Sequence, residues 1–189
     1  MRPVLLVPPA LEPVTLAELK PHLSVDGNEQ DTLIQMYLDA AIGYLDGYSG
    51  VLSRCLMSQV WQVALTGWMP AALPFLDVTN LQVFYTDAGG DMQTLGSTQY
   101  QTFEDIDGTG IVFEGATLPL LADVPAPVQV EITSGALIAT QVPAPVRGAV
   151  LLLAAHLYLN REAVVSGASP SELPFSVRTL IAPYRKYVV

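Results

Sequence analysis

Residue types that could carry out chemistry are sparse in this chain and stand apart from one another. The 189 residues include one cysteine, Cys55, and two histidines, His22 and His156. A single thiol excludes an intramolecular disulfide, and two histidines leave little material for a metal site. Cys55 has no identifiable histidine partner, so a buried or incidental thiol is a simpler interpretation than a nucleophile. Both histidines lie in expected helices, where a packed structural role is the more frequent one.

The densest group of ionisable side chains is Glu104, Asp105 and Asp107, followed by Gly108 and Gly110. An Asp-x-Asp-Gly sequence is part of a calcium-binding loop, but the other ligands and the closing glutamate are missing. A polar hairpin turn accounts for the same residues, because Asp and Gly favour the backbone angles of turns. A small acidic enzyme or a calcium-dependent binding protein built on residues 103–114 is retained as an alternative.

Sequence motifs of common enzyme classes are missing. The chain contains no phosphate-binding loop, no dinucleotide-binding glycine motif, no zinc-protease motif and no nucleophile elbow. The aromatic residues that could line a pocket instead have the spacing of packed core faces. They are Trp61, Trp68, Tyr37, Tyr44 and Tyr48. We therefore expect no catalytic residue, no cofactor, no metal and no enzymatic activity.

Charge is distributed unevenly along the chain, whose net charge is −10. Residues 1–145 hold three basic and sixteen acidic residues, a balance of −13, whereas residues 146–189 hold five basic and two acidic residues, a balance of +3. Such an acidic body argues against nonspecific binding of nucleic acid. Either the basic end offsets the acidic body within one fold, or it meets its counterpart on a neighbouring copy.

The clearest secondary-structure signal is a helix from Asp31 to Tyr48, with Asn28 as its expected cap and Gly47 and Gly50 as stop signals. Before it, Thr15 and Glu18 form a capping box that predicts a short helix over residues 16–23, limited to little more than two turns by Pro21. The first 14 residues are expected to form an extended arm. The long helix carries an apolar stripe that needs a partner helix: Leu33, Ile34, Tyr37, Leu38, Ala41, Tyr44, Leu45 and Tyr48.

Strand patterns fill the middle of the chain. Trp61, Val63 and Leu65 alternate with Gln62 and Ala64, and residues 128–133 alternate in the same way. Further strands are expected over residues 75–86, over a hairpin partner at 92–95, and over 100–106 and 111–114. Residues 56–135 are thus predicted to form an antiparallel unit of about five or six strands.

Helix returns near the C-terminus. Pro145 is well placed as a first helical residue, and an almost unbroken apolar surface follows from Val146 to Leu159. This helix is the expected partner of the long N-terminal one, and a short helix follows over 175–182. The predicted fold class is α+β, with one domain over residues 1–189. Helical segments 15–50 and 145–183 are expected to form a bundle into which a β unit of about 56–135 is inserted. Residues 184–189 form a tail. The first 14 residues are not expected to be a signal peptide, and the simplest placement is a reducing cytoplasm.

The two ends of the chain resemble the head-tail connector (adaptor, or head-completion) proteins of long-tailed bacteriophages and gene transfer agents. The N-terminal match consists of Thr15, Leu16, Glu18, Lys20, His22 and Leu23, then Val25, Asp26, Gly27 and Asp31, then Ala40, Ala41, Tyr44, Tyr48 and Gly50. The C-terminal match comprises VPAPVR at 142–147, YLNRE at 158–162, LP at 173–174 and LIAPYR at 180–185. Pro21 departs from the usual pattern.

The resemblance implies a structural virion protein, made in the cytoplasm of a host bacterium, that forms a ring in the neck. In the family, copies of the protein, twelve to a ring, dock on the portal protein after DNA packaging and provide the surface for a stopper or tail-terminator protein. DNA would pass through the lumen without sequence-specific binding, and no membrane is involved. The implied portal contacts are Arg178, Arg185 and Lys186. A tail-side module, such as a stopper or a tail terminator, is the alternative within the virion.

Overall fold

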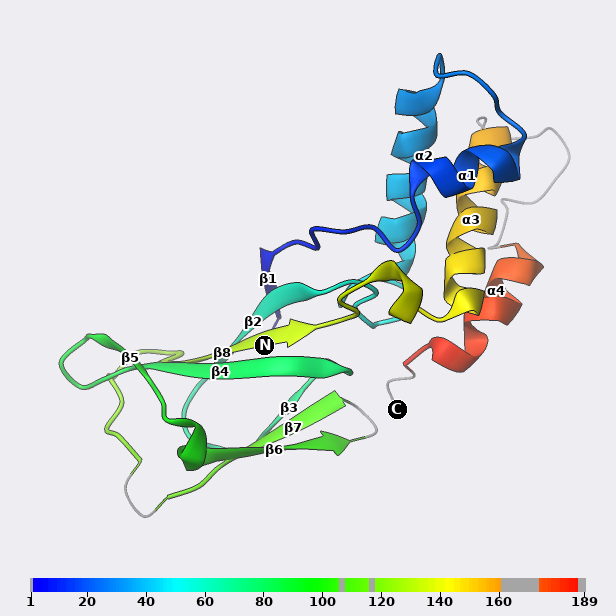
Figure 1. Cartoon of the computed structure of the whole chain (residues 1–189). Coiled ribbons are helices and arrows are strands. Elements are labelled where there is room, and N and C mark those ends of the chain that lie inside the picture. The colour runs from blue at the N-terminus through cyan, green and yellow to red at the C-terminus, as the bar shows by residue number, and fades with distance from the viewer. Residues whose placement is uncertain (1, 106–107, 116–117, 161–173, 187–189) are drawn as a thin grey trace, which may run out of the picture. The chain divides into compact units, whose positions relative to one another are not determined.

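The computed structural model describes residues 2–105, 108–115, 118–160 and 174–186. The chain divides into two compact units (Figure 1). One unit comprises the first ten residues with Met57–Gly135, and the other comprises Leu11–Leu56 with Ala136–Lys186. Helices and antiparallel strands are both present, so the fold is α+β as expected.

The helical unit is built from two segments that are distant in the sequence. Helix α2 packs along α3, as the apolar stripe requires, while α1 contacts both of them and α4 packs on α3 (Figure 1). The bounds of the helices are Leu16–Leu23 for α1, Asp31–Leu45 for α2, Ala144–Leu159 for α3 and Phe175–Ile181 for α4, which the short 3₁₀ helix η3 (Ala182–Tyr184) follows.

The core of this unit confirms the helical period read from the sequence. On α2 the fully buried side chains are Ile34, Leu38, Ala41 and Leu45, which lie on one stripe. Tyr44, expected on the same stripe, is instead 45% exposed. Helix α3, which packs against α2, is also apolar on its buried side. Its buried residues are Val146, Ala149, Val150, Leu153, Ala154, Ala155 and Tyr158.

The start and the end of α2 differ from the expectation. Asn28 does not cap the helix, because its side-chain oxygen accepts a hydrogen bond from Lys20 Nζ at 2.8 Å. The helix also ends at Leu45 and not at Tyr48. Asp46 leaves the helical conformation and its Oδ1 accepts a hydrogen bond from the Leu56 backbone at 2.6 Å, while Gly47 follows with a positive φ of 78°. The chain therefore turns away from the helix one turn early.

The capping box at the start of α1 is confirmed. The Glu18 backbone donates to Thr15 Oγ1 at 3.3 Å, and the Thr15 backbone donates to Glu18 Oε2 at 2.9 Å. Glu18 also forms an ion pair with Arg147 of α3. Hydrogen bonds from Thr15, together with the nearby Arg147 charge, hold the pKa of the Glu18 carboxyl below its usual value. One carboxylate thus caps α1 and links it to α3.

Glu18→Gln is expected to lower the free energy of unfolding of the helical unit by about 1 kcal/mol or less at neutral pH, because the group is exposed and solvent screens it. Since the folded state lowers the pKa of Glu18, its contribution is present above the ordinary glutamate pKa and is lost as the pH falls through the folded-state value. The difference between the variant and the original chain should therefore disappear in acid. Urea unfolding followed by helical circular dichroism at several pH values measures it, with Asp123→Asn as the control; an unchanged difference in acid would contradict the charge-based explanation.

The β unit contains two antiparallel sheets in the part of the chain that the structure describes. A five-stranded sheet has the order β1-β2-β8-β4-β5, and a three-stranded sheet has the order β3-β7-β6 (Figure 1). Seven strands fall within 56–135, more than the five or six expected. The strands are β1 Val4–Val7, β2 Gln59–Leu65, β3 Ala71–Leu73, β4 Val78–Thr86, β5 Met92–Thr94, β6 Tyr100–Asp105, β7 Gly108–Phe113 and β8 Val128–Ser134.

Alternation of buried and half-buried residues in β2 and β8 confirms the strand pattern in the sequence. Trp61, Val63 and Leu65 are buried, as expected. The extended N-terminal arm, by contrast, contains a strand that was not foreseen, since β1 pairs with the edge of β2. Strand β4 begins at Val78 and not at residue 75, because Phe75 is held in a turn by a bond from its backbone to Leu73 O at 2.8 Å.

Aromatic side chains join the two sheets within this unit. The ring of Trp68 lies 5.1 Å from that of Phe113 in β7 and 5.5 Å from that of Tyr85 in β4. Trp61 contacts Phe75 at a centroid distance of 5.6 Å, and Tyr100 donates a hydrogen bond to Leu81 O. Trp61 and Trp68 therefore belong to the packing of the β unit, as their spacing predicted.

Candidate functional site

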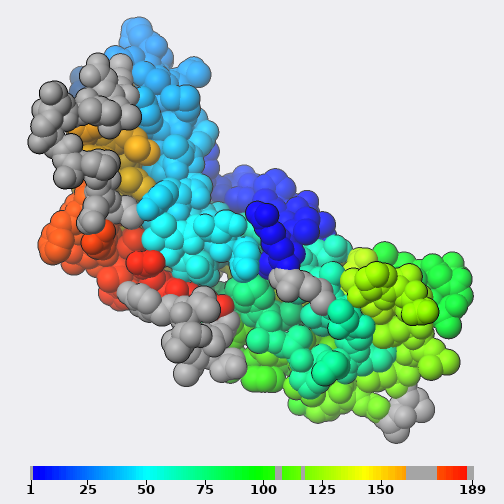
Figure 2. Space-filling model, turned by 180° about the vertical axis from the view of Figure 1, so that it is seen from behind, coloured from blue at the N-terminus to red at the C-terminus, as the bar shows by residue number. Residues whose placement is uncertain are grey.

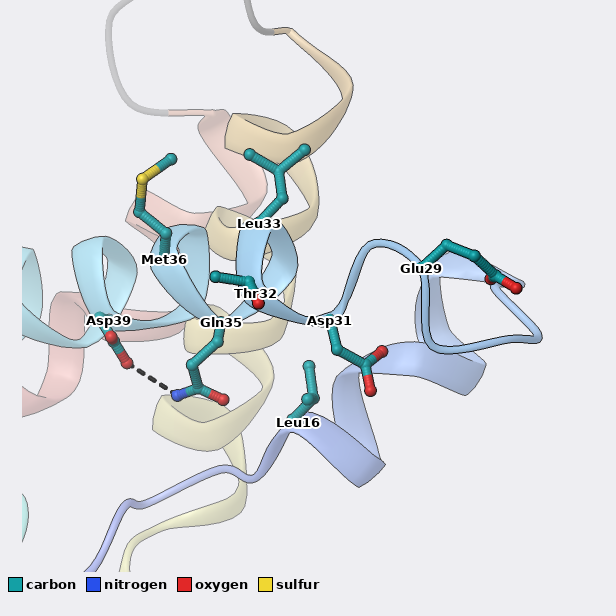
Figure 3. Close-up of a pocket in the computed structure, with 8 residues that line it drawn as sticks. All are labelled: Leu16, Glu29, Asp31, Thr32, Leu33, Gln35, Met36 and Asp39. Carbon is teal, nitrogen blue, oxygen red and sulfur yellow. Dashed lines mark hydrogen bonds between the residues drawn. The ribbon is translucent and has the colours of Figure 1, made fainter.

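A groove lies beside the first half of α2 in the helical unit. Its volume is about 860 Å³ (Figure 3). Leu33 and Met36 project to one side of α2, while Leu16, Asp31 and Gln35 lie toward α1 (Figure 3). The remaining lining residues are Glu29, Thr32 and Asp39. The surface thus combines apolar side chains with three carboxylates.

The loop between α1 and α2 is held in place by side chains that the sequence brings from both helices. Lys20 Nζ lies 2.7 Å from Asp31 Oδ1 and also donates to Asn28. On the other side of the groove, Gln35 Nε2 donates to Asp39 Oδ1 at 2.8 Å and to Glu12 Oε1 at 3.0 Å (Figure 3). These bonds orient Asp31 and Asp39, two of the three carboxylates of the groove, and Lys20 balances the charge of Asp31.

The chemistry of this groove suits binding of another protein surface better than catalysis. Its lining contains carboxylates, the hydroxyl of Thr32, the amide of Gln35 and apolar side chains, but neither cysteine nor histidine. Met36 is 54% exposed, which leaves an accessible apolar contact next to the charge of Asp39. Apolar contacts beside charged groups are typical of interfaces in which burial provides affinity and charge provides specificity. We refer to the eight lining residues as the acidic groove.

A second surface lies on α4. Val177 and Ile181 are buried, whereas Phe175, Arg178, Thr179 and Ala182 are all exposed and follow the i, i+3, i+4, i+7 spacing of one helix face. Phe175 is 84% exposed, although a phenylalanine is costly to leave in water. We refer to these four exposed residues as the α4 face.

The other expected portal contacts follow α4 directly. Arg185 is exposed, and its Nε donates to Val51 O at 3.2 Å, while the Lys186 backbone donates to Leu52 O at 3.1 Å. Through one side chain and one backbone N–H, these bonds hold the segment after η3 against the loop that follows α2. Arg178 lies apart from them, on the α4 face.

The cysteine and the two histidines lie in different environments. Cys55 is 4% exposed, so it is the buried thiol that was expected. His156 is only half-buried and not a core residue; its Nδ1 lies 3.2 Å from Asn160 Nδ2. The structure also brings His22 and His156 to one hollow of about 400 Å³, which the sequence did not indicate.

The acidic group in the β unit has hairpin geometry over its described residues. Glu104 pairs with Thr109, and Asp105 pairs with Gly108, across β6 and β7. Gly108 has a φ of 131° and an added Cβ would lie 2.2 Å from Leu73 O, so this position requires glycine. Asp107 lies outside the described residues. Within the described part of the chain, no three His, Cys, Asp or Glu side chains are grouped closely enough to hold a metal.

Residues 13–71, which include α1, α2 and β2, match the family model described as phage gp6-like head-tail connector protein. This match confirms the resemblance found in the sequence: residues 13–71 are similar to head-tail connector proteins. A comparison with curated proteins gives no match.

Solved structures with the same fold come from gene transfer agent (GTA) particles. The chain is 26% identical to a chain in the neck of an empty GTA particle computed with C6 symmetry, over 100% of this chain and 97% of that one, with a TM-score of 0.79. It is also 26% identical to a chain in the virion of a native GTA particle, over 97% and 96%, with a TM-score of 0.74. A chain in a native GTA neck computed with C12 symmetry shares the fold at 24% identity, over 97% of both chains, with a TM-score of 0.71.

These matches are to virion components and a connector family, which agrees with the expectation that the chain is not an enzyme. No helix in the described residues is long and apolar enough to cross a membrane. The acidic groove itself was missed by sequence reasoning. In the sequence, the groove is indicated by Met36 and Asp39, which are three residues apart on the polar side of the helix. This pattern does not distinguish a binding groove from an ordinary solvated helix face.

Proposed function

We propose that this protein is a structural component of a virion neck, where copies of it form a ring between the portal and the tail or stopper. The observation that supports this most strongly is the structural similarity to GTA neck and virion chains, which extends over nearly the full length of both compared chains. In this role the protein completes the head after DNA packaging and provides the surface on which the tail docks.

A ring explains why such a chain would need two distinct protein-binding surfaces. Identical copies close into a ring through heterologous contacts, in which one face of each copy meets a different face of the next. The relatives come from necks computed with C6 and C12 symmetry. Twelve copies is therefore the number that we propose. The four helices would form a bundle in the ring wall, with the β unit as an insertion.

The segment after η3 is the proposed portal contact. Arg185 and Lys186 give it positive charge, and the Arg185 side chain and the Lys186 backbone donate to Val51 O and Leu52 O of the loop after α2. Basic side chains on an ordered segment can direct docking through charge complementarity, which affects association and specificity strongly. Arg178, the third candidate from the sequence, lies on α4 and not in this segment, so the portal contact that we propose consists of Arg185 and Lys186.

The acidic character of the body suits a channel through which DNA passes without being held. With a net charge of −10, the protein would repel the phosphate backbone wherever its acids face the lumen. We propose that the passing DNA makes no sequence-specific contact. A neck structure with basic side chains around the lumen would contradict this.

The experiment that tests the proposed function is electron microscopy of the purified chain mixed with the portal ring encoded in the same genome. A layer of the protein on the portal, with a symmetry compatible with the portal, is the expected result. A bare portal together with assembled tails that acquire the protein would instead indicate the tail-side alternative, a stopper or tail terminator. If neither binds, calcium titration with melting-temperature measurements would test the alternative based on residues 103–114.

A further inference from the structure

We infer that the α4 face of one copy binds the acidic groove of the next copy in the ring. The inference rests on the proposed ring and adds to it the pair of surfaces through which neighbouring copies meet. Both surfaces belong to the helical unit, so one unit carries both halves of the contact.

The two surfaces lie on different helices of the helical unit. Helix α3 contacts both α2 and α4 (Figure 1). The buried residues of α4, Val177 and Ile181, place its Phe175–Arg178 face away from α3. On α2, Met36 and Asp39 are likewise outside the buried stripe. Both α2 and α4 reach the surface in the view from behind (Figure 2). A head-to-tail contact that continues from copy to copy requires this separation, because each copy must bind two neighbours at once.

The side chains of the two surfaces are complementary in polarity. The α4 face presents an 84% exposed phenylalanine one helical turn before an arginine. The acidic groove presents Met36, 54% exposed, one helical turn before Asp39. Residues three apart on a helix have Cβ atoms about 5–6 Å apart, so the spacing is the same on both helices. Phe175 can therefore contact Met36 while Arg178 contacts Asp39.

The apolar pair, Phe175 and Met36, and the charged pair, Arg178 and Asp39, would contribute to the contact in different ways. Burial of Phe175 against Met36 and Leu33 removes apolar surface from water, and a methionine thioether also packs well against an aromatic ring. Arg178 beside Asp39, with Glu29 in the same groove, gives the contact its charge preference. A second copy is the occupant that fits, because the basic surplus of residues 146–189 lies on the chain that carries the acidic surplus of residues 1–145.

Cross-linking tests the geometry directly. Gln35 lines the acidic groove one residue before Met36, and Thr179 follows Arg178 on the α4 face. With Phe175 opposite Met36 and Arg178 opposite Asp39, the two helices run parallel, so residues 35 and 179 lie on the same flank of the contact. The variant Gln35→Cys with Thr179→Cys, assembled on the portal and treated with a short bismaleimide, should give a ladder of covalent multimers. Each single-cysteine variant should give no ladder, since the contact joins two different faces and Cys55 is buried.

Charge exchange tests the chemistry. Asp39→Arg and Arg178→Asp, separately, are each expected to lower the fraction of portal rings that carry a complete layer by about tenfold, because each places like charges together. The double variant, which restores opposite charges, should recover most of the assembly. Asp123→Arg, an exposed charge reversal in the β unit, is the matched control and should assemble normally.

The outcomes separate the inference from the proposed function. A ladder for the double-cysteine variant together with recovery in the charge exchange supports the contact. A complete layer on the portal with neither ladder nor recovery would overturn the contact while leaving the neck function in place. A portal that stays bare with the original chain would overturn both.

Discussion

Reversing the charge of Arg185 and Lys186 together is expected to abolish docking of this protein on the portal ring while the fold stays intact. The variant Arg185→Glu with Lys186→Glu changes the local charge by four units, at a segment that the helical unit holds in place. A fixed, basic segment loses its attraction for an acidic partner surface and gains repulsion, and close charge pairs at interfaces contribute on the order of 1.5–7 kcal/mol. Docking measured by sedimentation with portal rings should therefore be lost.

The structure indicates why the fold should tolerate this change. Lys186 is anchored through its backbone N–H, which the substitution retains. Arg185 is exposed, and the substitution removes the bond from its Nε to Val51 O at 3.2 Å. The helical circular dichroism and the unfolding midpoint of the variant should match those of the original chain to within the effect of about one exposed hydrogen bond.

Two controls make the docking result specific. Arg185→Lys with Lys186→Arg keeps both charges and should dock, while Arg2→Glu reverses an exposed charge in the other unit and should also dock. Unchanged docking of the double-glutamate variant would remove Arg185 and Lys186 from the portal contact. It would not affect the contact between copies, which uses different residues.

Leu38→Ala is expected to give the largest loss of stability of any single change considered. Leu38 is completely buried on the face of α2 that packs along α3. Removing a buried leucine side chain costs about 2–5 kcal/mol, because the transfer free energy is lost and a cavity remains. The effect should concentrate in the helical unit, since Leu38 contributes to that core.

The measurement uses the different spectroscopic signals of the two units. Both tryptophans, Trp61 and Trp68, lie in the β unit, whereas helical circular dichroism reports on the helical unit. Urea unfolding of Leu38→Ala should shift the circular dichroism transition to lower urea. Met36→Ala, two residues away on the exposed side of the same helix, should change the free energy of unfolding by about 0.5 kcal/mol or less. Equal losses in the two variants would contradict the assignment of the buried stripe.

The sequence determined the elements whose signal is local. A stripe at helical spacing predicts which side of α2 is buried, and Ile34, Leu38 and Leu45 are indeed in the core. The capping box of Thr15 and Glu18 depends on residues three apart, and it is present. Period-two alternation predicted the buried face of β2. Such patterns are reliable because the backbone geometry of helix and strand fixes which neighbouring residues share a face.

Only the tertiary structure decided the features that depend on distant partners. Strand β1 exists because β2 offers a free edge, and the ends of α2 are shifted because Lys20 binds Asn28 and Asp46 binds the Leu56 backbone. The acidic groove forms where α1 and α2 meet, and α4 presents Phe175 because α3 covers its other side. Local periodicity cannot determine these arrangements, because they depend on which buried faces pair once the chain has folded.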